Sequence, residues 1–161
     1  MSGSASLGSV KSKMAQEQVR IALDSSYLIA LLSSWHAQHP RTLGSYQHWS
    51  DRDAQIILPA HTILECYSVL TRLPAPYRLP PDIVVQAMQE NFSHTALVVG
   101  VKASEIWERI DSFSRLRLGG GQVYDALIAW CAADAGATIL LTWNLKHFAA
   151  IAPPGLEVRE P

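Results

Sequence analysis

Residues 119–144, GGGQVYDALIAWCAADAGATILLTWN, determine how the rest of the chain is interpreted. Three glycines open this stretch, and the apolar residues after them predict a helix that is apolar on nearly every side. A helix of this kind belongs in the interior of a domain. Asp125 nevertheless lies in its first two turns, and a buried carboxylate is costly unless it is paired or binds a metal. We therefore expect a cationic partner at Asp125.

The composition limits the class of protein. The chain has 161 residues, of which 48% are hydrophobic and 17% charged, and this suits one globular domain with a proper core. The net charge of −1 excludes a global basic surface, so a nucleic acid would have to be held by a local patch or through metal ions. Cys66 and Cys131 lie far apart in apolar surroundings, and we expect both to be reduced core residues of a cytoplasmic protein. No apolar run reaches the roughly 18 residues of a membrane span, so we expect no association with a membrane.

The chain divides into a short lead and one domain. Residues 1–18 are rich in Ser, Gly and Lys and lack the apolar region of a signal peptide, so we expect a disordered lead or a remnant of expression. Residues 19–161 are expected to form a single domain in which short apolar runs alternate with helices. This alternation predicts a three-layer α/β/α domain with a mainly parallel sheet of about five strands. The predicted strands are 19–23, 54–60, 96–101, 137–142 and, at the sheet edge, 156–160. Besides the helix that carries Asp125, the predicted helices are 27–35, 42–51, 61–73, 82–92 with Asp82 as its N-cap, 102–117 and 145–151.

Three acids with apolar neighbours occupy equivalent places in this pattern. Asp24 directly follows the first predicted strand, and Glu65 lies in the first turns of the helix after the second strand. Asp125 lies in the first turns of a late helix, and Asn144 closes the fourth strand. Because the carboxyl ends of parallel strands meet at one edge of a sheet, we expect these four residues to form one cluster.

The cluster predicts a particular chemistry. Carboxylates that are brought together repel each other, and a shared hard divalent cation relieves the repulsion. Mg²⁺ prefers a few carboxylates together with several waters. Two such ions about 3.5–4 Å apart can hold the attacking and leaving oxygens of a phosphodiester. The cluster therefore predicts phosphoryl transfer to water, as in a nuclease or a phosphatase.

Each member of the cluster also has a simpler interpretation. Asp24 can be a helix N-cap, and Glu65 can be a first-turn acid that complements a helix dipole. Asn144 can be a turn former or a cap. Their joint occurrence with Asp125 at the strand ends favours a metal site over these separate explanations.

Asp125 has an alternative of its own, which is a buried ion pair with Arg115 or Arg117. Asp134 also lies on this helix, nine residues after Asp125, which places it on the opposite side. We therefore exclude Asp134 from the cluster.

The segments LDSSYLIALL (23–32), ILECYSVLTRL (63–73) and YDALIAWCAADAGATILLTWNLKHF (124–148) together resemble the PIN-domain ribonucleases. The resemblance is closest to the VapC-type toxins of bacterial toxin–antitoxin pairs, and it covers residues 19 to about 160 in the order and spacing of the family. It implies an endoribonuclease that depends on Mg²⁺ or Mn²⁺ and cuts single-stranded or looped RNA. It also implies a homodimer that a cognate antitoxin holds inactive.

Residue by residue, the resemblance assigns Asp24, Glu65 and Asp125 as catalytic metal ligands. Asn144 falls where many members have a fourth acid and others have Asn in a T-x-N motif. Its amide can orient a water, but the site has one charge less. Hydrogen bonds that hold the carboxylates are expected from Ser25, Ser26 and Thr142. RNA contacts are expected from Lys146, His147, Arg115 and Arg117, with Arg72 as a further candidate and Trp143 as the candidate for base stacking.

Two other functions stay open at this point. The missing fourth acid permits a PIN-like domain with weak catalysis that acts by binding RNA or protein. A flavodoxin-like phosphohydrolase would need a nucleophilic Asp with a partnering acid, and the segment 24–26, Asp-Ser-Ser, lacks that D-x-D pattern.

Overall fold

A computed structural model describes residues 18–161, so all but the last residue of the predicted lead, 1–18, lies outside the described part. Within the described part, five strands form one sheet in the order β3-β2-β1-β4-β5, and every neighbouring pair is parallel. The predicted α/β/α architecture with a five-stranded parallel sheet is confirmed, and the last strand does lie at an edge. The strands are β1 (Arg20–Leu23), β2 (Gln55–Pro59), β3 (Ala96–Val99), β4 (Ile139–Leu141) and β5 (Glu157–Arg159).

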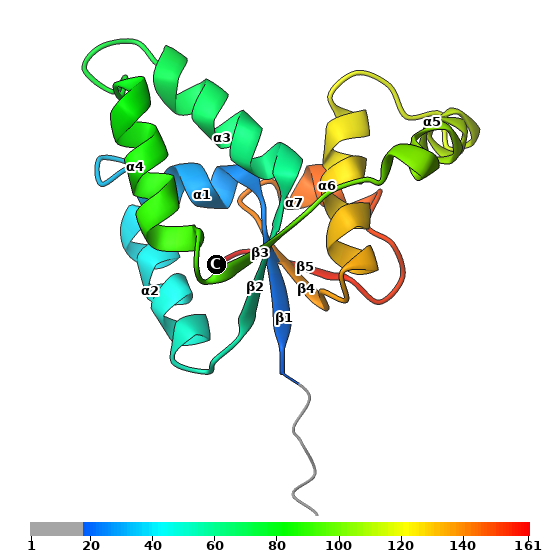
Figure 1. Cartoon of the computed structure of the whole chain (residues 1–161), viewed down its shortest axis with the longest axis horizontal. Helices are drawn as coiled ribbons and strands as arrows, with labels where there is room; N and C mark the ends of the chain where they lie inside the picture. Colours follow the sequence, from blue (N-terminus) through cyan, green and yellow to red (C-terminus); the bar gives the residue numbers. More distant parts are fainter. Residues whose placement is uncertain (1–17) are drawn as a thin grey trace, which may run out of the picture.

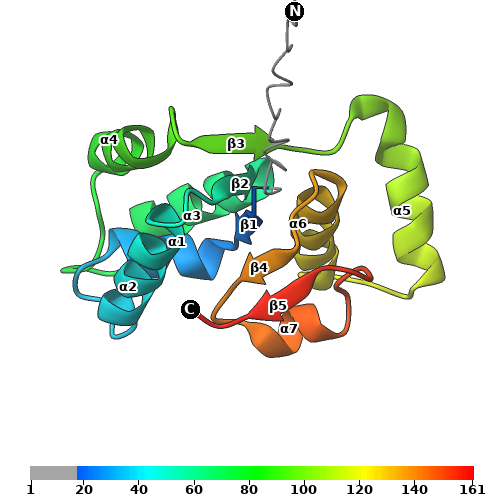
Figure 2. The same cartoon turned by 90° about the horizontal axis from the view of Figure 1, so that it is seen from below.

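Helices cover both faces of the sheet (Figures 1 and 2). One face is covered by α1 (Ser25–Leu32), α2 (His39–Ser50), α3 (Ala60–Arg72) and α4 (Pro81–Phe92). The other face is covered by α6 (Gln122–Asp134) and α7 (Leu145–Ala149). Helix α5 (Ile106–Arg115), which the 3-10 turn η1 (Ala103–Glu105) precedes, lies on the outer side of α6. None of the helices in residues 18–161 has the length and apolar character needed to cross a bilayer.

Some helix boundaries differ from those predicted. The first helix begins at Ser25 because Asp24 acts as its N-cap and accepts a hydrogen bond from the Ser26 N–H group. Asp82 is not the N-cap of α4, because the helix already begins at Pro81, where the fixed φ of proline suits the first turn. The helix predicted over 102–117 is instead divided into η1 and α5.

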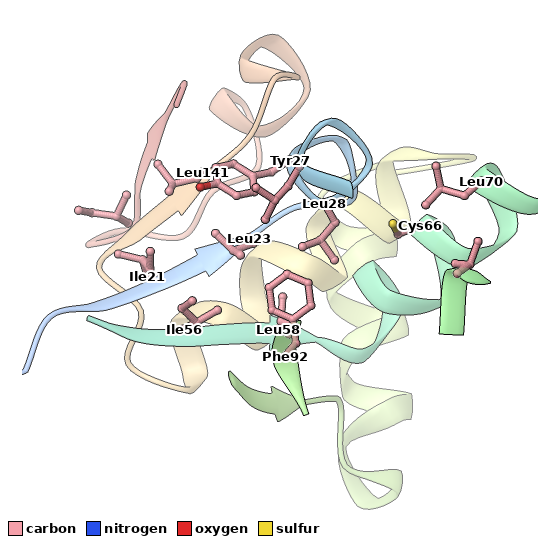
Figure 3. Close-up of a cluster of buried hydrophobic side chains, with 13 residues drawn as sticks. Ile21, Leu23, Tyr27, Leu28, Ile56, Leu58, Cys66, Leu70, Phe92 and Leu141 are labelled. Atoms are coloured by element: carbon pink, nitrogen blue, oxygen red, sulfur yellow. The ribbon is translucent and has the colours of Figure 1, made fainter. Parts of the chain in front are cut away.

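Two hydrophobic cores follow from the alternation of side chains along the central strands. On the face of α1, α3 and α4, Ile21, Leu23 and Leu58 pack with side chains of these helices, as Figure 3 shows. On the opposite face, Ala22 and Ile57 lie against α6 and α7. Both cysteines are buried free thiols, as predicted.

The strand order also locates the functional edge of the sheet. From β1 the chain moves to β2 and β3 on one side, and β4 and β5 are added on the other side. Ligands of parallel α/β sheets bind beyond the carboxyl ends of the strands where the order reverses, which here is between β1 and β4. Asp24 directly follows β1, and its backbone N–H donates to the carbonyl of Leu141 at the end of β4, at 3.1 Å.

Candidate active site at the carboxyl edge of the sheet

Asp24 is buried at the carboxyl end of β1, with 1% of its surface exposed. Its Oδ2 atom accepts hydrogen bonds from the Ser26 N–H (3.2 Å), the Ser26 hydroxyl (2.7 Å) and the Thr142 hydroxyl (2.8 Å). Its Oδ1 atom has one long contact, from the Ser25 hydroxyl at 3.3 Å. Ser25, Ser26 and Thr142 thus form the hydrogen bonds expected of them. Because the donors gather on Oδ2, Oδ1 keeps lone pairs for a further ligand.

The hydroxyls of Ser26 and Thr142 also form hydrogen bonds with the turn after β4 and so link it to Asp24. Ser26 Oγ accepts from the Trp143 N–H at 2.9 Å, and Thr142 Oγ1 accepts from the Asn144 N–H at 2.9 Å. Asn144 occupies the N-cap position of α7, but its side chain makes no capping hydrogen bond. The cap interpretation therefore holds for its backbone position, while the amide side chain is free to face the cleft that it lines.

Trp143 has a supporting role next to this turn. Its indole Nε1 donates to Thr42 Oγ1 at 3.0 Å, and the Arg41 guanidinium lies 5.0 Å from the centre of its ring. These contacts join the end of β4 to α2, and Trp143 lies outside the lining of the cleft. The geometry therefore does not favour the base-stacking role considered for this residue.

Glu65 and Asp125 reach the site from two helices. Glu65 lies in the second turn of α3, so the interpretation as a first-turn dipole acid is wrong. Asp125 lies in the first turn of α6. The predicted alternative of an arginine partner for Asp125 is also wrong within residues 18–161, because Arg115 instead pairs with Asp111 at 2.9 Å along α5. The basic group near Asp125 is His147, whose Nδ1 lies 3.7 Å from Asp125 Oδ2.

The electrostatics of Asp125 show that the carboxylates share one environment. Burial raises the pKa of Asp125, and the negative charges of Asp24 and, to a smaller extent, Glu65 raise it further. His147 and His61 act in the opposite direction. Asp125 is therefore close enough to both Asp24 and Glu65 to be repelled by their charges.

Glu65, Asp125 and His147 line a cleft of about 520 Å³, and Asp24 is buried next to the lining residue Ser25. Lys146 and His147 lie on it, as predicted for RNA-contacting residues, whereas Arg115, Arg117 and Arg72 do not. Arg115 is placed elsewhere because α5 lies on the outer side of α6. The residues that line the cleft are Ser25, Glu65, Gly121, Gln122, Tyr124, Asp125, Asn144, Lys146, His147 and Ala150.

Gln122 and Tyr124, which line this cleft, and His61, which contacts Tyr124, were not predicted from the sequence. The ring of His61 stacks on that of Tyr124, and its charge lowers the pKa of Asp125. A signal for His61 was present, because it lies four residues before Glu65 and therefore on the same face of α3. Asp134, which was excluded, indeed faces away from the cleft and pairs with Arg109 of α5.

The donor set fits a divalent cation by its chemistry. Asp24, Glu65 and Asp125 are all hard oxygen donors, and among residues 18–161 no Lys or Arg forms an ion pair with any of them. No group of three or more His, Cys, Asp or Glu side chains in residues 18–161 is arranged so that it could hold a metal ion without further ligands. The metal itself stays a prediction.

The sheet order, the acid cluster and its position together define the class of the protein. The model of the PIN domain family matches residues 21–152, and the chain belongs to this family. Two curated relatives come from Mycobacterium tuberculosis. Ribonuclease VapC27 is 34% identical over 119 residues, which cover 74% of this chain and 81% of the relative. Ribonuclease VapC40 is 35% identical over 126 residues, which cover 78% of this chain and 87% of the relative.

Solved structures show the same fold. The VapC20 protein of M. tuberculosis, described as a sarcin–ricin loop cleaving toxin, matches with a TM-score of 0.62 at 18% identity, over 81% of this chain and 94% of that one. VapBC2 from Rickettsia felis, solved with a DNA fragment from its promoter, matches with a TM-score of 0.62 at 16% identity. The match covers 89% of this chain and 99% of that one. The predicted resemblance to VapC-type PIN domains is confirmed.

Proposed function

We propose that this chain is a metal-dependent endoribonuclease and the toxin of a type II toxin–antitoxin pair. The observation that carries the proposal is that Glu65 and Asp125 line one cleft and that the charges of Asp24 and Glu65 both act on Asp125. None of the three acids has a Lys or Arg partner in the described chain, and Asp24 lies at the point where the strand order reverses. The curated relatives named ribonucleases support it at 34% and 35% identity. The same function was predicted from the sequence.

The residues at the cleft have different roles in the proposed hydrolysis. A bound Mg²⁺ or Mn²⁺, held by Asp24, Glu65 and Asp125, would neutralise charge on the phosphate and acidify a water. Asn144 orients the attacking water through its amide, and the carboxylate of Asp125 in the cleft accepts the proton of that water. Lys146 attracts the phosphate backbone at the mouth of the cleft. Water attacks phosphorus and the bond to the 3′ oxygen breaks, which leaves a 3′-hydroxyl and a 5′-phosphate.

The proposed partners are RNA, a cognate antitoxin and a second copy of the chain. Structural neighbours include VapBC complexes from Rickettsia felis and Salmonella typhimurium, which supports an antitoxin. The surface that the antitoxin or the second copy would contact is part of the proposal.

Substitution of Asp125 by Asn tests the enzymatic proposal. Asn keeps the shape but removes the charge and the proton acceptor, so cleavage is expected to fall by roughly 10²–10⁴-fold. The measurement is cleavage of total RNA by purified protein with Mg²⁺, Mn²⁺ or EDTA, with both new ends mapped. Asp134→Asn is a matched control, because it removes an acid from the same helix on the side away from the cleft. Full cleavage by Asp125→Asn would contradict the mechanism.

One observation favours a second candidate function. Asn144 lines the cleft where a fourth acid would complete the charge, which permits a domain that binds RNA with weak catalysis. The same assay separates the two functions. A protein that binds RNA and leaves it intact with either metal ion acts as a binding module.

A further inference from the structure

We propose that Tyr124 and His61 form a stacking platform for the nucleobase next to the cleaved phosphodiester. The inference rests on the proposed function, because it identifies a nucleotide-binding subsite of the same cleft. The two rings are parallel to within 1°, and their centroids are 4.6 Å apart. Such a pair presents flat aromatic surface of the kind on which bases stack.

The platform lies directly beside the acids. Tyr124 precedes Asp125 on α6 and lines the cleft. His61 lies one helical turn before Glu65 on α3, and its influence on the pKa of Asp125 shows that it is close to the cluster. The pair therefore connects the two helices that carry two of the three acids. A base on this platform would belong to a nucleotide adjoining the reacting phosphate.

The exposure of Tyr124 favours a ligand over a purely structural role. Its surface is 53% exposed, so the ring adds little to the hydrophobic core. The rest of the cleft lining is mainly polar or charged, with Gln122, Asn144 and Lys146 suited to phosphate and sugar oxygens. Among the described residues that line the cleft, Tyr124 is the only Phe, Tyr or Trp. Trp143 cannot replace it, because its indole is bonded to Thr42 and covered by Arg41.

The platform is compatible with the single-stranded or looped RNA that the resemblance to PIN-domain ribonucleases implies. A base can stack on a side chain only after it leaves its own stack, and this is easiest in a single strand, a loop or a bulge. Stacking tolerates every base because each has a π-face. We therefore expect the base on the platform to be chosen more by its stacking strength than by its hydrogen-bonding edge.

Fluorescence of 2-aminopurine tests the platform directly. The probe is a single-stranded RNA with 2-aminopurine at successive positions around a mapped cleavage site, bound to Asp125→Asn so that it stays intact. Quenching is expected at one position beside the cleaved bond. Adding Tyr124→Leu is expected to abolish that quenching and to weaken RNA binding about tenfold, whereas Tyr124→Phe recovers most of both. Tyr67→Leu serves as a control, since Tyr67 is an exposed tyrosine of α3 outside the cleft lining.

Kinetics and melting separate the possible failures. In the active protein, Tyr124→Leu is expected to raise KM about tenfold with little change in kcat or Tm. Unchanged RNA affinity and quenching would overturn the inference, and a lowered Tm with normal RNA affinity would show that the pair is a structural bridge. Failure of the wild-type protein to cleave any RNA would instead overturn the proposed function. In that case, 2-aminopurine placed at every position of a bound single-stranded RNA in turn would still test the platform through binding.

Discussion

At the residue scale, the buried carboxylate of Asp24 acts as an anchor as well as a candidate ligand. It caps α1 and, through Ser26 and Thr142, holds the turn that carries Asn144. Functional and structural roles are therefore not alternatives at this position. The N-cap interpretation and the metal-ligand interpretation of Asp24 use different oxygens of the same side chain.

The raised pKa of Asp125 predicts a trade-off between stability and function. Because the folded state raises this pKa above its unfolded value, the folded state binds more protons, and its stability falls as pH rises through the interval between the two values. The Asp125→Asn variant has no ionisable group at this position, so its stability does not fall in this way as the pH rises. In EDTA it is expected to melt at a higher temperature than the wild type at pH 7, and the difference should shrink as pH falls through the raised pKa. Thermal melting between pH 4 and pH 8 checks this, and parallel curves would contradict it.

The candidate acids could be predicted because each lies next to an element that the sequence marks clearly. Asp24 directly follows a buried strand, and Asp125 interrupts an otherwise apolar helix. The Tyr124–His61 pair could not be predicted in this way, because it depends on how closely α3 and α6 approach each other. The position of Arg115 outside the cleft lining could not be predicted for the same reason, since the direction of α5 is not encoded in local periodicity.

At the scale of elements, the strands were easier to predict than the helix ends. The three central strands are buried on both faces and appear in the sequence as short apolar runs. Helix ends depend on local competition, as at Pro81, which starts α4 one residue before the predicted cap. Likewise, residues 103–105, which were predicted as the start of an α-helix over 102–117, form a 3-10 turn before α5.

Helix α5 is expected to open independently of the rest of the domain. It is held to α6 by Phe113, which is 6% exposed and lies 5.1 Å from Trp130 between ring centroids, and by Arg109, which pairs with Asp134. Removing a buried phenylalanine side chain costs about 3–5 kcal/mol. Phe113→Ala is therefore expected to speed amide exchange in α5 by about 100-fold, with much smaller changes in β1, β2 and β4.

Hydrogen exchange followed by mass spectrometry measures this difference element by element. Trp107→Ser is the matched control, because Trp107 lies on the same helix but is 78% exposed, and its loss should leave exchange unchanged. Equal acceleration across the whole sheet would show that α5 unfolds only with the domain.

At the scale of the whole molecule, the strand order is what makes separate acids into one site. Asp24, Glu65 and Asp125 are distant in sequence, and they meet because β1 is central and the sheet grows from it in both directions. The α3 and α6 acids then approach from opposite faces of the sheet, above its carboxyl edge. A point substitution in this cluster should consequently change activity without changing the fold.

Growth of cells that make the protein without an antitoxin tests the function of the molecule as a whole. If RNA cleavage causes toxicity, induced wild-type protein is expected to arrest growth, and Asp125→Asn is expected to permit it at equal protein level. Asp134→Asn, which leaves the cleft intact, should arrest growth like the wild type. Colony counts after induction, with the protein quantified by immunoblot, provide the measurement. Arrest by Asp125→Asn at wild-type strength would show that binding alone is toxic, because the substitution removes a charge needed for hydrolysis while the other lining residues of the cleft remain.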